Sequence, residues 1–147
     1  MKKLTSIILP FIVGFILISS CNSGPAPINY GSDGCTFCKM TIVDKQHVAQ
    51  IVTEKGKNYK YDAIECMIND LNNWDKPPVK LHLVADYKKP GELTDALTAS
   101  YLISKEIPSP MGAFLSGFSS AAARDEMHNS VQGEKLNWNE LKLKFKD

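Results

Sequence analysis

The hydrophobic residues of this chain follow two periodicities, and each predicts a different kind of element. β-Prone residues fill 48–53, and after a short turn aromatic and polar residues alternate over 58–61, which predicts a β-hairpin. The apolar residues that follow recur at helical spacing, which predicts a helix over 63–72. Asp62 occupies the position of an N-cap and Glu65 follows three residues later, as in a capping box.

The rest of the chain repeats this order of strands followed by a helix. It predicts strands at 79–85, 100–104 and 113–118, a helix over 121–128 capped by Ser119 or Ser120, and a last helix from Asn137 to Leu143. An irregular loop separates the last two strands because prolines interrupt it. We therefore expect an α+β fold, a small single domain built from two ββα-like units.

The N-terminal segment differs from this domain in its pattern. Two lysines precede an apolar run over 4–18, which ends in two serines, and this order is typical of a secretory signal peptide over 1–20. A transmembrane helix is the alternative, because the run approaches the minimum length for crossing a bilayer. Pro10 and Gly14 within the run favour the signal peptide.

The signal is followed by Ile18-Ser19-Ser20-Cys21, which resembles the bacterial lipobox. Lipidation at Cys21 would give several hydrocarbon chains, and more than one chain is needed for stable membrane attachment. The next residues are rich in Gly, Pro, Ser and Asn, so we expect a lipidated flexible tether over 21–34 and a folded domain over 35–147. The predicted location is the cell envelope, anchored to a membrane and facing the periplasm.

Composition and charge argue against some classes of function but identify none. A chain of 147 residues suits one compact domain, and its 17 basic and 16 acidic side chains leave no basic footprint for nucleic acid. No Ser/His/Asp pattern or paired carboxylates indicate catalysis in the sequence. We therefore expect neither an enzyme nor a nucleic-acid partner.

Candidate chemistry concentrates in Cys35-Thr36-Phe37-Cys38-Lys39-Met40. Two thiolates separated by two residues can close on one ion, and the thioether of Met40 can reach the same side of an extended segment. Thiolates with thioethers select a soft ion, and copper(I) fits this set better than zinc. Met111 lies in a loop stiffened by prolines and is a further candidate ligand, with packing in the core as the open alternative.

Other interpretations of the cysteines remain open at this point. A Cys-x-x-Cys pair outside the cytoplasm can form a disulfide, so a thiol–disulfide oxidoreductase using Cys35 and Cys38 is the alternative function. A structural zinc site would need a second pair of ligands, which Cys66 and a histidine could supply. We interpret Cys66 as a core residue, because free cysteine is among the most buried residue types. The three histidines are interpreted as surface residues: His47, His82 and His128.

These features, in this order, resemble the NosL family, the copper-binding lipoproteins that accompany nitrous oxide reductase. The resemblance covers most of the chain after the signal and rests on the lipobox at Cys21 and four further motifs: Cys35-Thr36-Phe37-Cys38-Lys39-Met40, Tyr61-Asp62-Ala63-Ile64-Glu65-Cys66-Met67, Val84-Ala85-Asp86 and Ser109-Pro110-Met111-Gly112. The combination is more specific than any one motif. The family fold of ββα units agrees with the pattern described above.

The resemblance implies a copper(I) chaperone that delivers metal to apo nitrous oxide reductase, together with an ABC-type maturation complex in the membrane. It implies Cys38, Met40 and Met111 as ligands, with Cys35 nearby. Many relatives have a histidine soon after the Pro-Met-Gly stretch, whereas Ala113 and Phe114 follow here, so the resemblance gives no histidine ligand. A homodimer is a further possibility at this stage.

Overall fold

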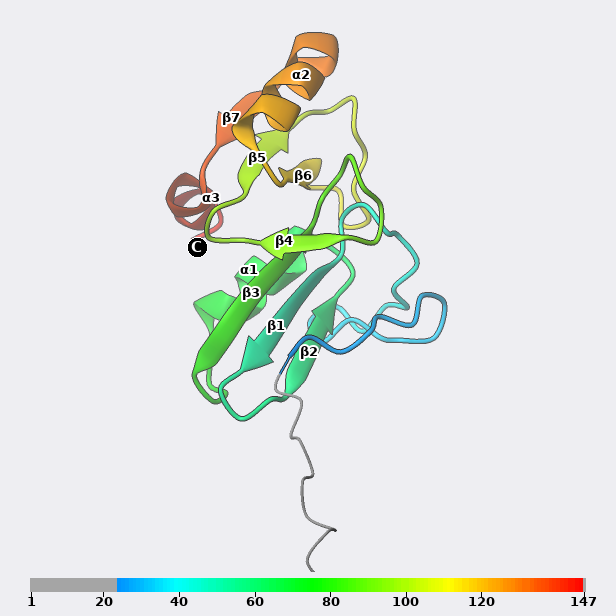
Figure 1. The fold of residues 1–147 in the computed structure, drawn as a ribbon, viewed down its shortest axis with the longest axis vertical. Helices are drawn as coiled ribbons and strands as arrows, with labels where there is room; N and C mark the ends of the chain where they lie inside the picture. Colours follow the sequence, from blue (N-terminus) through cyan, green and yellow to red (C-terminus); the bar gives the residue numbers. More distant parts are fainter. Residues whose placement is uncertain (1–23, 147) are drawn as a thin grey trace, which may run out of the picture.

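The computed structural model describes residues 24–146, which form two antiparallel sheets and three helices (Figure 1). The predicted signal peptide over 1–20 and the predicted lipidation site Cys21 lie outside the described residues. Two strands followed by a helix open each half of the fold, which confirms the expected α+β domain with two ββα-like units. Within 24–146, none of the helices has the length and apolar character needed to cross a bilayer.

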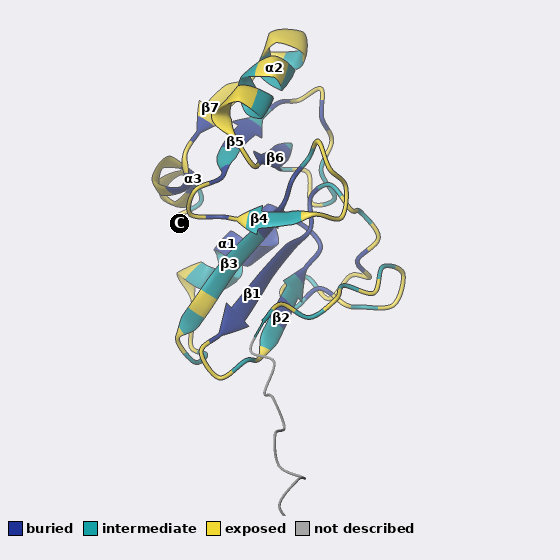
Figure 2. Ribbon diagram, in the orientation of Figure 1, coloured by how far each residue is buried: buried dark blue, intermediate teal, exposed yellow. Residues whose placement is uncertain are grey.

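The first sheet has the strand order β2-β1-β3-β4. Its strands are Ala49–Thr53 (β1), Asn58–Tyr61 (β2), Val79–Ala85 (β3) and Leu93–Asp95 (β4). All five residues of β1 are buried, as the dark blue ribbon in Figure 2 shows. The reason is that helix α1 (Ile64–Asn72) covers one face of the sheet, while the chain before the first strand crosses the other.

That preceding chain is the part of the predicted tether that the structure describes. The Ala26 N–H donates to Asn58 Oδ1 at 2.9 Å, Gln50 Nε2 donates to the Ala26 carbonyl at 3.0 Å, and Lys60 Nζ donates to the Pro27 carbonyl at 2.6 Å. Residues 24–34, which composition assigned to a flexible tether, are thus hydrogen-bonded to the first hairpin. Polar side chains of the first hairpin form hydrogen bonds with the backbone of Ala26 and Pro27, and composition alone does not reveal such partners.

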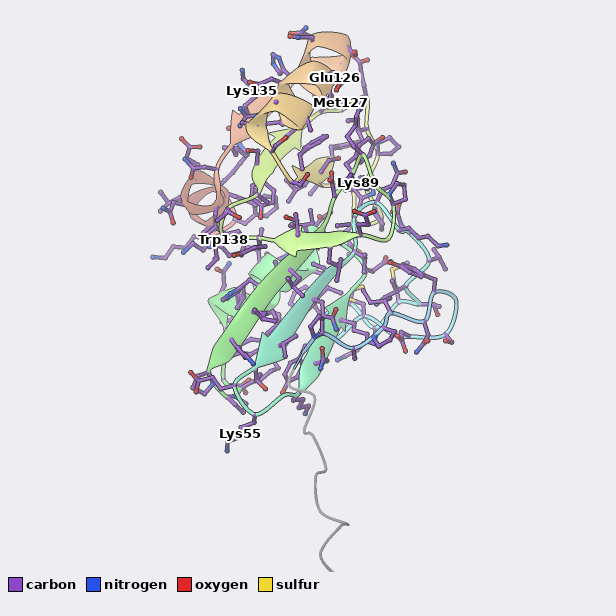
Figure 3. All side chains as sticks on the ribbon, in the orientation of Figure 1. Lys55, Lys89, Glu126, Met127, Lys135 and Trp138 are labelled. Carbon is purple, nitrogen blue, oxygen red and sulfur yellow. The ribbon has the colours of Figure 1, made fainter. Side chains whose placement is uncertain are left out.

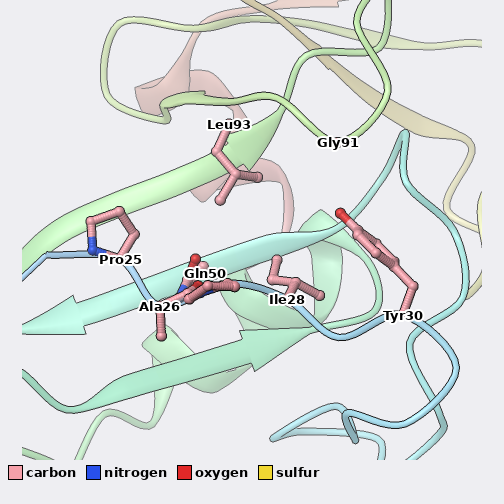
Figure 4. A pocket seen from close by; sticks show the side chains of 8 residues that line it. Pro25, Ala26, Ile28, Tyr30, Gln50, Gly91 and Leu93 are labelled. Carbon is pink, nitrogen blue, oxygen red and sulfur yellow. The ribbon is translucent and has the colours of Figure 1, made fainter.

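A shallow cavity of about 370 Å³ lies where this segment crosses the sheet (Figure 4). Its lining is mainly apolar, and Gln50 forms part of it. Gln50 is fully buried, and its Oε1 has no hydrogen-bond partner among the described residues. The amide is held by its Nε2 group, which donates to both Ala26 and Asn58.

The second sheet has the order β6-β5-β7 and is covered by two helices. Its elements are Ser100–Ile103 (β5), Leu115–Phe118 (β6), Glu134–Leu136 (β7), Ala121–Val131 (α2) and Trp138–Lys144 (α3). Ser120 caps α2 and Asn137 forms a capping box with Glu140 at α3, as the sequence predicts for both caps. Strands β4 and β7, of three residues each, were not predicted, because such short segments carry too little alternation.

The two sheets share one core and meet closely along β3 and β6. A Cβ atom on Gly117 would lie 3.1 Å from the Ala85 carbonyl and 3.2 Å from the Cδ1 atom of Ile64, so a larger side chain here would crowd these elements. Trp138, labelled in Figure 3, also connects the two sheets, because it contacts a residue of β3 and a residue of β5. Its ring lies 5.9 Å from that of His82 and 6.2 Å from that of Tyr101.

The start of α1 differs from the sequence-based prediction. The helix begins at Ile64 after Ala63, which offers no side-chain cap, and Asp62 and Glu65 form no capping box. Both carboxylates are buried instead, at 2% and 4% exposure. Other segments supply their hydrogen-bond donors: Ser109 Oγ and the Ala113 N–H donate to Glu65, and the Val43 N–H donates to Asp62.

Candidate metal centre

The loop between Gly34 and Thr41 closes the Cys-x-x-Cys segment into a tight turn. Gly34 and Thr41 form an antiparallel bridge, and inside it the Cys35 N–H donates to the Met40 carbonyl at 2.8 Å. Lys39, at φ 67°, adopts the left-handed conformation, and its N–H donates to the Cys35 carbonyl at 3.1 Å. The backbone therefore fixes the loop before any ion binds.

A third cysteine joins this loop through the edge of the first sheet. The Thr36 N–H donates to the Lys60 carbonyl of β2 at 2.7 Å, so the loop lies beside the strand that leads into α1. The Sγ atoms of Cys35, Cys38 and Cys66 consequently lie within 4.8 Å of one another. Three sulfurs at tetrahedral corners, about 2.3 Å from zinc, would lie about 3.8 Å apart. A small contraction would thus bring this cluster to coordination distance.

Cys66 is a candidate site residue that the sequence analysis interpreted as part of the core. It is buried, as expected of a core residue, but its sulfur also faces the other two cysteines. One sequence signal could have indicated that Cys66 lies near the other two cysteines. Cys66 stands in the first turn of the helix that directly follows β2, the strand that pairs with the Cys35–Cys38 loop. Among the described residues, the cluster of candidate metal-binding side chains contains cysteines alone.

Hydrogen bonds to Cys35 set the charge of the cluster. The Cys66 thiol donates to Cys35, and with the backbone N–H groups of Asp62 and Cys38 it lowers the pKa of Cys35 to about 5 despite burial. The pKa of Cys66 is raised, first because its thiol proton is held by Cys35 and then by burial. Burial also raises the pKa of Cys38. At neutral pH the cluster therefore holds one thiolate and two thiols.

The buried carboxylate of Asp62 adds negative potential beside this thiolate. Its side chain is 2% exposed, and its Oδ1 has no hydrogen-bond partner within residues 24–146. Burial and then the charge of Cys35 raise the pKa of Asp62, while the Val43 N–H opposes the shift. A cation among the three sulfurs would relieve this repulsion, because an opposite charge stabilises both anions.

Both candidate methionines are on the surface. Met40 is 54% exposed and Met111 is 41% exposed, so the alternative interpretation of Met111 as a core residue is wrong. The loop that carries Met111 is attached to α1, because Glu65 Oε1 accepts hydrogen bonds from Ser109 Oγ at 3.0 Å and from the Ala113 N–H at 3.3 Å. Glu65 directly precedes Cys66, so this attachment lies one residue from the cysteine cluster.

The sequence model of the NosL family matches residues 27–145 of the chain. The protein belongs to the NosL family. The crystal structure of the copper chaperone NosL from Shewanella denitrificans shares the fold, with a TM-score of 0.69 and 17% sequence identity over 80% of this chain and 95% of that chain. The comparison with curated proteins gave no significant match.

The family match includes the cysteine loop, the start of α1 and the Met111 loop. It also begins inside the predicted tether, which agrees with the contacts that residues 24–34 make with the first sheet.

One histidine of this NosL-family protein contradicts the sequence-based interpretation. His47 is 3% exposed rather than on the surface, while His82 and His128 are partly buried. The Nδ1 atom of His47 lies 3.0 Å from Asp44 Oδ2, and its Nε2 atom lies 3.3 Å from Ser116 Oγ. The fold thus assembles a Ser/His/Asp arrangement that no sequence spacing indicates. Ser116 is fully buried, so the arrangement ties the segment after Met40 to β6 and offers no nucleophile to a substrate.

Proposed function

We propose that this NosL-family protein carries copper(I) on Cys35, Cys38, Cys66, Met40 and Met111, and delivers it to apo nitrous oxide reductase. The observation that carries the proposal is the convergence of three cysteine sulfurs, from two distant segments, within 4.8 Å. Thiolate and thioether ligands favour a soft monovalent ion over oxygen-seeking cations. The family supplies the copper context, and the residues of this chain supply the ligands.

The differing exposure of the five side chains suggests how the ion leaves. Cys35 and Cys66 are buried at 2% and 1% exposure, whereas Met40 and Met111 are exposed. A client cysteine, methionine or histidine can therefore approach from the methionine side and bind the ion before a chaperone ligand dissociates. Such ligand exchange needs neither a general base nor a nucleophile, which agrees with a protein that is not an enzyme.

The anchor would hold this site near a membrane. Three peptide units separate Cys21 from Gly24, the first described residue, and an extended chain of that length spans at most about 11 Å. A lipidated Cys21 would thus keep the folded domain close to the bilayer of the cell envelope, facing the periplasm. An ABC-type maturation complex in that membrane would be within reach, and a homodimer of the chaperone remains a prediction.

Copper(I) titration of the purified, reduced protein against a competing chelator tests the proposal. Cys38→Ser and Met40→Ala should each weaken the affinity by about tenfold or more, because each removes one sulfur ligand. Met127→Ala serves as the control, since Met127 lies on α2 and packs against a separate small cluster of core residues. Unchanged affinity in both loop variants would overturn the proposed site.

A thiol–disulfide oxidoreductase is the second candidate, because Cys35 has a pKa of about 5 and lies close to Cys38. Reactive cysteines of this class combine a low pKa with exposure. Cys35 is only 2% exposed, which disfavours this function. An insulin-reduction assay separates the two functions: turnover that is lost in Cys35→Ser and is insensitive to copper would favour the oxidoreductase.

A further inference from the structure

Glu65 is a buried carboxylate in the first turn of α1 that none of the proposed ligands accounts for. It is 4% exposed, and acidic side chains are rarely buried without compensating partners. Its Oε1 accepts two hydrogen bonds, from Ser109 Oγ at 3.0 Å and from the Ala113 N–H at 3.3 Å. Its Oε2 is buried and has no hydrogen-bond partner in the described part of the chain.

Both donors belong to the loop that carries Met111, one on each side of it. Ser109 Oγ also accepts the Phe114 N–H at 2.9 Å, and the Gly112 N–H donates to the Ser109 carbonyl at 3.0 Å. Gly112 and Phe114 have φ angles of 78° and 58°. A non-glycine residue in this left-handed region is disfavoured unless its surroundings hold it there. The loop is therefore a closed turn, with Met111 between its two attachments to Glu65.

We propose that Glu65 is a positioning residue, which holds the Met111 thioether in place for the ion bound at the cysteines. This inference rests on the proposed function, in which Met111 is a ligand. The same helical turn would then carry one ligand, Cys66, and the anchor of another. Docking through one carboxylate oxygen would join a ligand near the second sheet to a site built on the first.

Two features favour positioning over a general contribution to stability. Glu65 neither caps its helix nor forms an ion pair within residues 24–146, so the loop is the sole partner of its carboxylate there. Hydrogen bonds to a charged acceptor are also stronger than neutral ones, which suits the anchoring of a loop that is partly exposed.

A double-mutant cycle between Glu65 and Met111 tests the inference in the full-length protein. Glu65→Ala should weaken copper(I) affinity by about tenfold or more in the wild-type background, the range typical of residues that orient a ligand. In the Met111→Ala background the same change should have no further effect, because the ligand that it positions is already absent. X-ray absorption at the copper edge should show one sulfur fewer in Glu65→Ala, as in Met111→Ala. Glu65→Gln, which keeps an acceptor oxygen for both donors, should retain the sulfur count.

The outcomes separate this inference from the proposed function. Equal losses of affinity in both backgrounds would overturn the positioning role, because they would show that Glu65 acts without Met111. Weakened binding in Met111→Ala together with full affinity in Glu65→Ala would also overturn it, while leaving Met111 as a ligand. Unchanged affinity and sulfur count in Met111→Ala would show that Met111 is not a ligand. This result would overturn both the proposed role of Met111 and the positioning role of Glu65. Glu65→Gln also guards against a folding defect, because loss of the sulfur in Glu65→Ala with its retention in Glu65→Gln supports the inference.

Discussion

The thiol of Cys66 donates a hydrogen bond to the sulfur of Cys35, although one residue lies in α1 and the other in the loop before the first strand. This bond lowers the pKa of Cys35 and raises the pKa of Cys66. In the metal-free site one proton thus links the two buried sulfurs of Cys35 and Cys66. A metal ion that binds both sulfurs must displace that proton.

The first prediction concerns the pH dependence of copper(I) affinity. Cys35 is already a thiolate at neutral pH, whereas Cys38 and Cys66 have raised pKa values and must lose protons to the solvent. Each displaced proton raises the affinity about tenfold per pH unit, so two protons give up to about 100-fold. Chelator competition at several pH values, corrected for the chelator, should give a slope near two. Cys38→Ser should reduce the slope by one, and a flat profile in the wild type would contradict the assigned protonation states.

The second prediction concerns the stability of the metal-free protein. The pKa of Cys35 falls from an ordinary thiol value of 9.0 to about 5 in the folded state. Between these values the unfolded chain binds more protons, so the free energy of unfolding rises with pH. The contribution is complete above the unfolded pKa and is lost as the pH falls toward about 5. Its slope is at most about 1.4 kcal/mol per pH unit.

Urea denaturation of the wild type and Cys35→Ser measures this contribution as a difference between the two proteins. The difference should grow as the pH rises from about 6 to about 8. Cys38 and Cys66 have raised pKa values, so their own effect on stability appears only above the ordinary thiol pKa. A difference that stays constant over this range would mean that Cys35 is a thiol in the folded protein.

The elements of this fold were largely predictable because their signals are local. Helix α1 and the first hairpin follow from periodicity, and the caps Ser120 and Asn137 follow from residue type and position. The β-prone residues of β1 are typical of a strand, although its buried Gln50 and Thr53 are polar. Strands β4 and β7 pair at sheet edges over three residues each, and such pairing is set by tertiary contacts that no short pattern encodes.

Only the local part of the candidate site was predictable from the sequence, because tertiary contacts bring in the rest. Cys35 and Cys38 are separated by only two residues, and this spacing indicates a shared partner. Cys66 joins them through the tertiary fold, in which the Thr36 N–H pairs with the Lys60 carbonyl of β2, a backbone contact that is not specific to side-chain type. The carboxylate of Glu65 was assigned to a helix cap because its spacing fits one, but a distant loop supplies its donors.

The third prediction tests the contact between the two sheets. A methyl group at Gly117 would lie 3.1 Å from the Ala85 carbonyl, a backbone atom that cannot rotate away. Gly117→Ala should therefore lower the free energy of unfolding by about 1–3 kcal/mol through overpacking. Gly34→Ala is the matched control, because a Cβ there meets no atom within 4 Å and φ is not positive. Equal midpoints for both variants in urea denaturation would show that β6 does not pack on β3 as described.

The last prediction decides whether Cys66 is a ligand or only a core residue. Cys66→Ala removes a small buried side chain, so stability should fall by about 1 kcal/mol under either interpretation. Copper(I) affinity distinguishes the two, because loss of a third thiolate should weaken binding by about tenfold or more, whereas loss of packing alone should not.

Loss of Cys66 should also release Cys35 from its hydrogen bond. The pKa of Cys35 should then rise toward the ordinary thiol value, because its first stabilising donor is gone. Thiolate absorbance in the ultraviolet, followed against pH in the metal-free protein, measures this shift. Met67→Leu, a change of similar volume at the adjacent buried residue, controls for packing in α1. Full affinity in Cys66→Ala, together with an unchanged thiolate titration, would reduce the site to the loop cysteines and their methionine partners.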